Sequence, residues 1–198
     1  MLYSVDRLMN QWEILMNESG PRTAASINDP LQHLVDCHDR IEERLQTLER
    51  LLPHLTSATE STSREARDAL KNSLEFLETM GAIHTRDEED SLFPRLLARV
   101  GKEDPTVVEL TTMLESQHRE KEEVFRKLLD HVLTLPTAPA PPSADQLRRL
   151  EGLVAHLTDL YRPHIMVENQ RLIPLSRDFL LESDLIQMQE EMRNRRVK

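Results

Sequence analysis

Glycine and aromatic residues are scarce in this chain of 198 residues, which contains 4 glycines and 4% aromatics. Alternating runs of Val, Ile or Thr, which indicate strands, are also missing, whereas Leu, Glu, Arg and Ala recur at helical spacing. No apolar run approaches the roughly 18 residues of a membrane-spanning helix, and the N-terminus has no apolar stretch typical of a signal peptide. These shortages predict an all-α fold, no membrane partner and, by default, a cytoplasmic location.

Positive charge is in the minority, because 25 Lys and Arg face 35 Asp and Glu, for a net charge of −10. Phosphate binding requires a basic face, so the sequence argues against nucleic acid as a partner. The one cysteine, Cys37, excludes an internal disulfide, and its ordinary interpretation is a small core residue. The length suffices for one well-filled core with some residues left for terminal additions.

Prolines and capping residues divide the chain into helices. Four long amphipathic helices are predicted: from Asp29 to Pro53, from Thr62 to Gly101, from Asp104 onward, and from Ser143 onward after the proline-rich connection 135–142. Two shorter segments, 4–17 and 183–196, also carry apolar stripes, which must be buried on the bundle or against a second copy. We therefore expect an N-terminal helical extension at 1–28, a bundle at 29–176 and a C-terminal helical extension at 177–198, in a monomer or homodimer.

One pattern occurs twice in the chain, 80 residues apart. The segments His84–Pro94 and His164–Pro174 both read His-x3-Glu-x3-Leu-apolar-Pro. The same shift maps His38 onto His118, and each of these lies 46 residues before its His-x3-Glu partner. Residues four apart project from one face of a helix, so each His and Glu pair can reach one metal ion.

Six residues form the predicted metal site. A single histidine on an apolar stripe is usually a core residue, but four histidines on inward faces with one repeat offset are not independent. Ionised carboxylates in a bundle core also require a cation or a cluster of donors. Imidazole and carboxylate suit iron, manganese or zinc, and two carboxylates from facing helices suit a pair of ions about 3.5–4 Å apart. The predicted ligands are His38, His84, Glu88, His118, His164 and Glu168.

Several neighbouring residues are less certain candidates. Glu122 stands one turn after His118 and is kept as a candidate for one additional ligand. His156 and Tyr161 precede the histidine of the fourth helix and are candidates for contacts around the ligands. Glu89 is expected to be exposed. The sequence identifies no catalytic acid or base.

The chain resembles the hemerythrin-like, or HHE cation-binding, family over about residues 29–176. The matching residues are His38-Asp39-Arg40-Ile41 on the first helix, His84-x3-Glu88 with Leu92-Phe93-Pro94 on the second, His118 on the third, and His164-x3-Glu168 with Leu172-Ile173-Pro174 on the fourth. The resemblance implies an up-down-up-down four-helix bundle that holds a non-haem di-iron centre, bridged by both glutamates and an oxo or hydroxo group.

Within this family, the ligand pattern differs from that of the oxygen carriers. Oxygen-carrying hemerythrins have His-x3-His on the third helix and His-x4-Asp on the fourth, where this chain has His118-x3-Glu122 and His164-x3-Glu168. The ligand set is closer to the di-iron proteins that repair iron–sulfur clusters, although their N-terminal cysteine-bearing region has no counterpart here.

Three functions stay open from the sequence. The first is a cytoplasmic di-iron protein that binds or senses O2 or NO, or handles iron, with zinc or manganese as substitute metals. The second is a di-iron redox enzyme, peroxidase-like or nitric-oxide-reducing, in stress or repair. The third is a helical adaptor with a vestigial site. The expected partner is a small diatomic ligand or none.

Overall fold

The structure is a computed structural model that describes residues 27–56, 60–101, 104–137 and 140–197. All regular secondary structure within these ranges is helical. The helix predicted at 4–17 lies outside the described residues. The all-α prediction is confirmed for the part of the chain that the structure describes.

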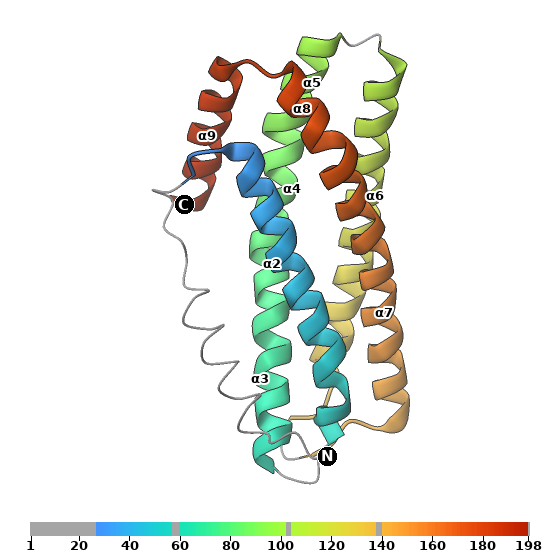
Figure 1. Ribbon diagram of the computed structural model, residues 1–198. Coiled ribbons are helices and arrows are strands. Elements are labelled where there is room, and N and C mark those ends of the chain that lie inside the picture. Colours follow the sequence, from blue (N-terminus) through green and yellow to red (C-terminus); the bar gives the residue numbers. More distant parts are fainter. Residues whose placement is uncertain (1–26, 57–59, 102–103, 138–139, 198) are drawn as a thin grey trace, which may run out of the picture.

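Four helical rods form an up-down-up-down bundle (Figure 1). The first rod is α2 (Pro30–Leu51), which ends in the 3-10 turn η2 (Leu52–Thr56). The second rod consists of α3 (Glu60–Phe76), η3 (Leu77–Gly81), α4 (Ala82–Asp87), η4 (Glu88–Leu92) and α5 (Phe93–Val100). The third rod is α6 (Pro105–Leu133). The fourth consists of α7 (Ala144–Val167), η5 (Glu168–Leu172) and α8 (Ile173–Phe179).

A fifth helix, α9 (Glu182–Val197), lies beside one end of the bundle. It contacts α2, α4 and η4, so the predicted C-terminal helix packs on the bundle. Met188 and Met192 supply its buried face, and both are fully buried. The oligomeric state stays a prediction from the sequence.

Side-chain caps fix the starts of three rods. The Asp29 carboxylate accepts the backbone N–H groups of Leu31 and Gln32 at the start of α2, and the Asp104 carboxylate accepts that of Thr106 at the start of α6. Ser143 forms a capping box with Gln146 at the start of α7. The start predicted at Thr62 is wrong, because α3 already begins at Glu60.

Each copy of the repeated pattern contains a π turn, η4 in the second rod and η5 in the fourth. In η4 the Phe93 N–H donates to the carbonyl of Glu88, five residues earlier. Pro94 has no N–H and its ring would crowd the carbonyl four residues before it, so a wider turn ahead of the proline relieves the conflict. π turns are rare and are frequent at functional sites. The helix type therefore changes ahead of the proline in both copies of the pattern.

Two apolar clusters fill the bundle, with a polar layer between them. The lower core, toward α3 in Figure 1, includes Leu45, Leu48, Leu70, Leu74, Leu128 and Leu157. The upper core, toward α9, includes Leu31, Leu34, Leu92, Phe93, Leu114 and Met188. Both clusters combine residues from all four rods, so they hold the rods in register where the polar layer crosses the bundle.

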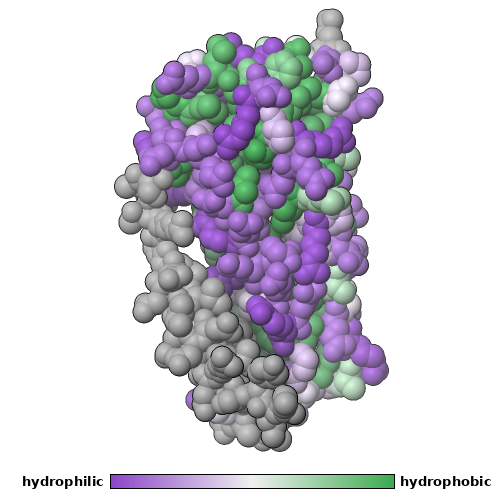
Figure 2. Space-filling view, viewed as in Figure 1, coloured by the Kyte–Doolittle hydropathy of each residue, from purple (hydrophilic) through white to green (hydrophobic). Residues whose placement is uncertain are grey.

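The surface is mostly hydrophilic in the view of Figure 2, with hydrophobic residues gathered at the end of the bundle near α5, α8 and α9. Phe179, Leu181 and Ile186 are the exposed apolar side chains of the α8–α9 junction. Within the described ranges, no helix combines the length and apolar character needed to cross a membrane. The cytoplasmic location stays a prediction.

Candidate metal centre

The six predicted ligands meet in the polar layer between the two cores. Each rod contributes one histidine, from α2, α4, α6 and α7 in turn, and the π turns η4 and η5 contribute the glutamates. All six side chains are buried, and both glutamates are completely inaccessible. The members of this layer are His38, His84, Glu88, His118, His164 and Glu168. The fold therefore converts two sequence repeats into one cluster.

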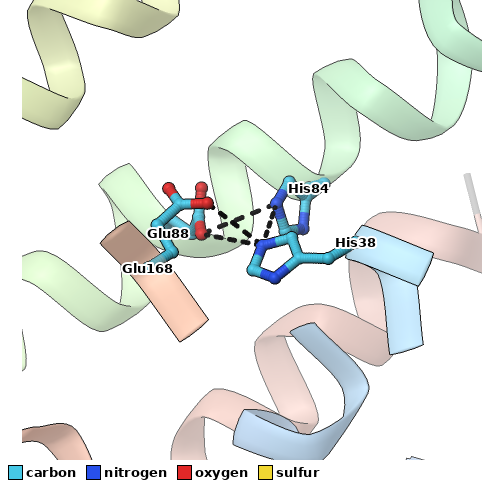
Figure 3. A group of neighbouring side chains, drawn as sticks. All are labelled: His38, His84, Glu88 and Glu168. Carbon is cyan, nitrogen blue, oxygen red and sulfur yellow. Dashed lines mark hydrogen bonds and ion pairs between the residues drawn. The ribbon is translucent and has the colours of Figure 1, made fainter. Parts of the chain in front are cut away.

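One half of the cluster joins the first two rods to both glutamates (Figure 3). The Nε2 atoms of His38 and His84 lie 3.0 Å apart. Glu168 Oε2 is 3.1 Å from His38 Nε2, and Glu88 Oε1 is 3.5 Å from His84 Nε2. Figure 3 shows the four side chains pointing toward one another.

The other half repeats this arrangement on the third and fourth rods. The Nε2 atoms of His118 and His164 lie 3.2 Å apart. Glu168 Oε1 is 2.7 Å from His164 Nε2, and Glu88 Oε2 is 3.3 Å from His118 Nε2. Each glutamate thus presents one oxygen to each pair of histidines.

The contacts fit ligands around two common centres better than an internal hydrogen-bond network. All four carboxylate oxygens of Glu88 and Glu168 are buried without a hydrogen-bond partner, although imidazole nitrogens face them. Two donors about 2.1 Å from one ion and at right angles to each other lie about 3.0 Å apart, close to the observed Nε2 separations. In each four-residue group the ligand atoms all lie within 4.8 Å of one another. The residues present therefore fit a pair of metal ions.

The glutamates set the charge of the metal-free histidines. Burial alone would lower the pKa of His38 and His118, but the carboxylates of Glu168 and Glu88 raise it to about 10 and about 9, respectively. Burial lowers the pKa of His84 to about 3. Burial also raises the pKa of both glutamates, but the surrounding imidazoles outweigh this effect and hold both pKa values low. Bound metal would take the place of one imidazole proton in each group.

The residue that follows each of the two glutamates accepts a hydrogen bond from a histidine of another rod. His118 Nδ1 donates to Glu89 Oε1 at 2.7 Å, and His38 Nδ1 donates to Asn169 Oδ1 at 2.7 Å. Such bonds fix the ring orientation and leave Nε2 for a metal. Glu89 was expected to be exposed, but it is partly buried by this bond. The 80-residue repeat could have revealed the contact, because it relates Glu89 to Asn169 and His118 to His38.

The hydrogen bonds of the remaining two histidines, His84 and His164, do not follow the repeat. His164 Nδ1 donates to Gln117 Oε1 at 2.9 Å, whereas His84 Nδ1 has no hydrogen-bond partner among the described residues. The residue that corresponds to Gln117 is Cys37, whose thiol accepts from Arg40 instead. The two halves of the cluster therefore differ beyond the ligands themselves.

The other sequence candidates do not join the cluster. Glu122 is exposed on α6, so it offers no ligand, and His156 is exposed on α7. Glu42, which occupies the position in α2 that corresponds to Glu122, pairs with Arg162 on α7 and is not a sequence candidate for the site. Tyr161 is partly buried, in agreement with a place near the ligands.

Lys121 is a residue of the core that was not predicted from the sequence: it is 4% exposed, and its ammonium lies 4.6 Å from the centroid of the Tyr161 ring. The signal was the apolar stripe of α6, which continues from His118 through position 121 to Val124 and Leu128. Position 122, the predicted candidate for an additional ligand, lies outside this stripe.

Glu89→Ala is expected to weaken metal binding in the His118 half by about 10- to 100-fold, the usual effect of removing the partner of a ligating imidazole. The measurement is a stepwise zinc titration of metal-free protein against a chelator, which separates the first ion from the second. Glu78→Ala, at an exposed position of the same rod, is the matched control and should bind both ions as wild type does. Identical titrations of the two variants would show that Glu89 does not support the metal.

Comparison with known proteins agrees with this geometry. Residues 29–176 match the family described as the Hemerythrin HHE cation binding domain. The match covers most of the chain, and the chain therefore belongs to this family, as its resemblance implied. A search of curated proteins finds no match.

Proposed function

We propose that the chain holds two non-haem iron ions in its core and presents them to a small ligand, dioxygen or nitric oxide. The main support for this proposal is that each glutamate directs one carboxylate oxygen toward each of the two histidine pairs. Carboxylates that project from facing helices support pairs of metal ions in other four-helix bundles. Membership of a cation-binding family supports the same function.

Donor counting supports free coordination positions at both ions. Each ion would receive two imidazole nitrogens and two carboxylate oxygens, fewer than the roughly six donors of an octahedral site. Glu122 is exposed and adds none. When bound, iron would supply Lewis-acid and electron-transfer chemistry at these positions. The chain would supply the dry, charged pocket around them.

The test is anaerobic reconstitution of metal-free protein with ferrous iron, followed by iron quantification and electronic spectroscopy. We expect about two ions per chain, binding of nitric oxide to the reduced protein, and oxidation by dioxygen rather than reversible binding of it. A ferric pair absorbs in the near-ultraviolet, which distinguishes it from zinc. A chain that takes up no iron, or only one ion, would contradict the proposal, and reversible dioxygen binding would contradict the free-position count.

A di-iron redox enzyme is the second candidate. The observation in its favour is that Lys121 and Tyr161 place two proton-bearing groups in the core layer next to the histidines. Turnover distinguishes the two functions. An enzyme consumes many equivalents of peroxide or nitric oxide per chain, whereas a sensor or carrier binds a stoichiometric amount.

A further inference from the structure

One layer of the core adjoins the histidines on the side of the lower core. It consists of the residues three positions from each histidine, one per rod: Ile41, Gly81, Lys121 and Tyr161. Ile41 is apolar and Gly81 has no side chain, so Lys121 and Tyr161 supply all the polar groups of this layer. The 80-residue repeat relates Lys121 to Ile41 and Tyr161 to Gly81, so both polar groups depart from the repeat.

The glutamates reach the histidines from the opposite side. Glu88 follows His84 by one turn in the direction of Leu92 in the upper core, and Glu168 stands in the same relation in the fourth rod. Lys121 instead follows His118 in the direction of Val124 in the lower core. The carboxylates and the Lys121 layer therefore bracket the histidines from two sides.

Lys121 is a buried cation with unused donors. Its ammonium lies over the ring of Tyr161 and makes no hydrogen bond or ion pair with any described residue. Burial lowers its pKa to about 8, although the charges of Glu168 and Glu88 oppose this effect. An ammonium has three donors, and an aromatic face attracts its charge without accepting strong hydrogen bonds from all of them. The N–H donors that the Tyr161 ring does not engage are available to a small anion.

Gly81 faces the Tyr161 hydroxyl. A methyl group at position 81 would lie 3.6 Å from Tyr161 Oη, which is ordinary contact. Gly81 therefore contributes no side-chain donor or acceptor, and Lys121 and Tyr161 remain the polar side chains of the layer.

We propose that Lys121 and Tyr161 form a binding site for a small anion on the face of the metal pair opposite the glutamates. This inference rests on the proposed function, because the anion would also contact the metal. Lys121 supplies positive charge and N–H donors, and Tyr161 supplies one O–H donor. The site would favour an anionic ligand, such as azide or reduced dioxygen, over a neutral one.

The test compares an anion with a neutral ligand in the iron-loaded protein. Lys121→Met keeps the length of the side chain and removes its charge. We expect azide to bind the oxidised variant at least about tenfold more weakly than wild type, the loss expected for one hydrogen bond to a charged group. The affinity of the reduced variant for nitric oxide should stay unchanged. A general disturbance of the site would instead lower the affinity for both ligands. Lys127→Met, at an exposed lysine of the same helix, is the control and should match wild type with both ligands.

A second variant keeps the inference testable if Lys121→Met fails to load iron. Tyr161→Phe removes only the hydroxyl and should weaken azide binding about threefold or more, again without effect on nitric oxide. Unchanged azide affinity in the iron-loaded variants would overturn the inference and leave the proposed function standing. A wild-type chain that binds no iron would overturn both.

Discussion

Replacing Glu168 by alanine is expected to remove both metal ions, from about two per chain to almost none. The reason is that its two oxygens face different histidine pairs, with Oε2 at 3.1 Å from His38 Nε2 and Oε1 at 2.7 Å from His164 Nε2. Each ion would therefore lose one of its four protein donors in a single substitution. The measurement is the iron content of reconstituted and desalted protein.

Two further variants separate a shared ligand from a general loss of structure. His84→Ala removes a donor from one half only, so the His118 half should keep its ion and the iron content should fall partially. Glu122→Ala changes an exposed glutamate of α6 and should keep both ions. Retention of two ions in Glu168→Ala would exclude the shared-ligand assignment, and an equal loss in Glu122→Ala would point to misfolding.

The cluster could be predicted because its members carry two independent signals. Each histidine lies on an apolar stripe, which predicts burial, and each also repeats at one offset, which predicts a common site. His38 illustrates the point, since either signal alone is compatible with an ordinary core histidine. The bundle itself followed from helix caps such as Asp29 and Ser143, which the structure confirms.

The layer around the cluster was harder to predict because its residues depend on small shifts in helix phase. Glu89 adjoins Glu88 in sequence, and regular α-helical geometry would turn it about 100° away from the site. In the structure Glu89 lies within the π turn η4, and its carboxylate accepts a hydrogen bond from His118 on another rod. Lys121 was overlooked for a chemical reason, since a lysine in a Glu- and Arg-rich helix is ordinarily a solvated charge. In the structure Lys121 is buried, and its ammonium lies over the ring of Tyr161.

The C-terminal helix anchors the second rod at the residue before Glu88. Asp87 is completely buried, and two arginines of α9 pair with it: Arg195 Nη1 lies 2.8 Å from Oδ1, and Arg196 Nη2 lies 2.6 Å from Oδ2. Burial raises the pKa of Asp87 even though both guanidinium groups oppose this effect. The buried Asp87 carboxylate therefore depends on the two arginines of α9 to balance its charge, because an unpaired buried charge is strongly unfavourable.

Replacing Arg195 and Arg196 together by alanine is expected to lower the free energy of unfolding by about 3–5 kcal/mol, the usual effect of removing the partners of a buried charge. For a chain of this size, that loss corresponds to a fall in Tm of roughly 10 °C. Urea and thermal unfolding of the metal-free protein provide the measurement, which keeps metal binding out of the comparison.

Asp87→Asn in the same background separates the buried charge from the lost packing of α9. A neutral amide is much less costly to bury than a carboxylate, so this third substitution should return most of the lost stability. Arg148→Ala serves as the control, because its pair with Asp145 is exposed on α7 and should contribute nothing measurable. Two outcomes would contradict this assignment: the Arg195 and Arg196 variant unfolds like Arg148→Ala, or Asp87→Asn restores no stability. In either case Asp87 is not the charge that α9 stabilises. The buried side chains of Met188 and Met192 would then be the main contacts that attach α9 to the bundle.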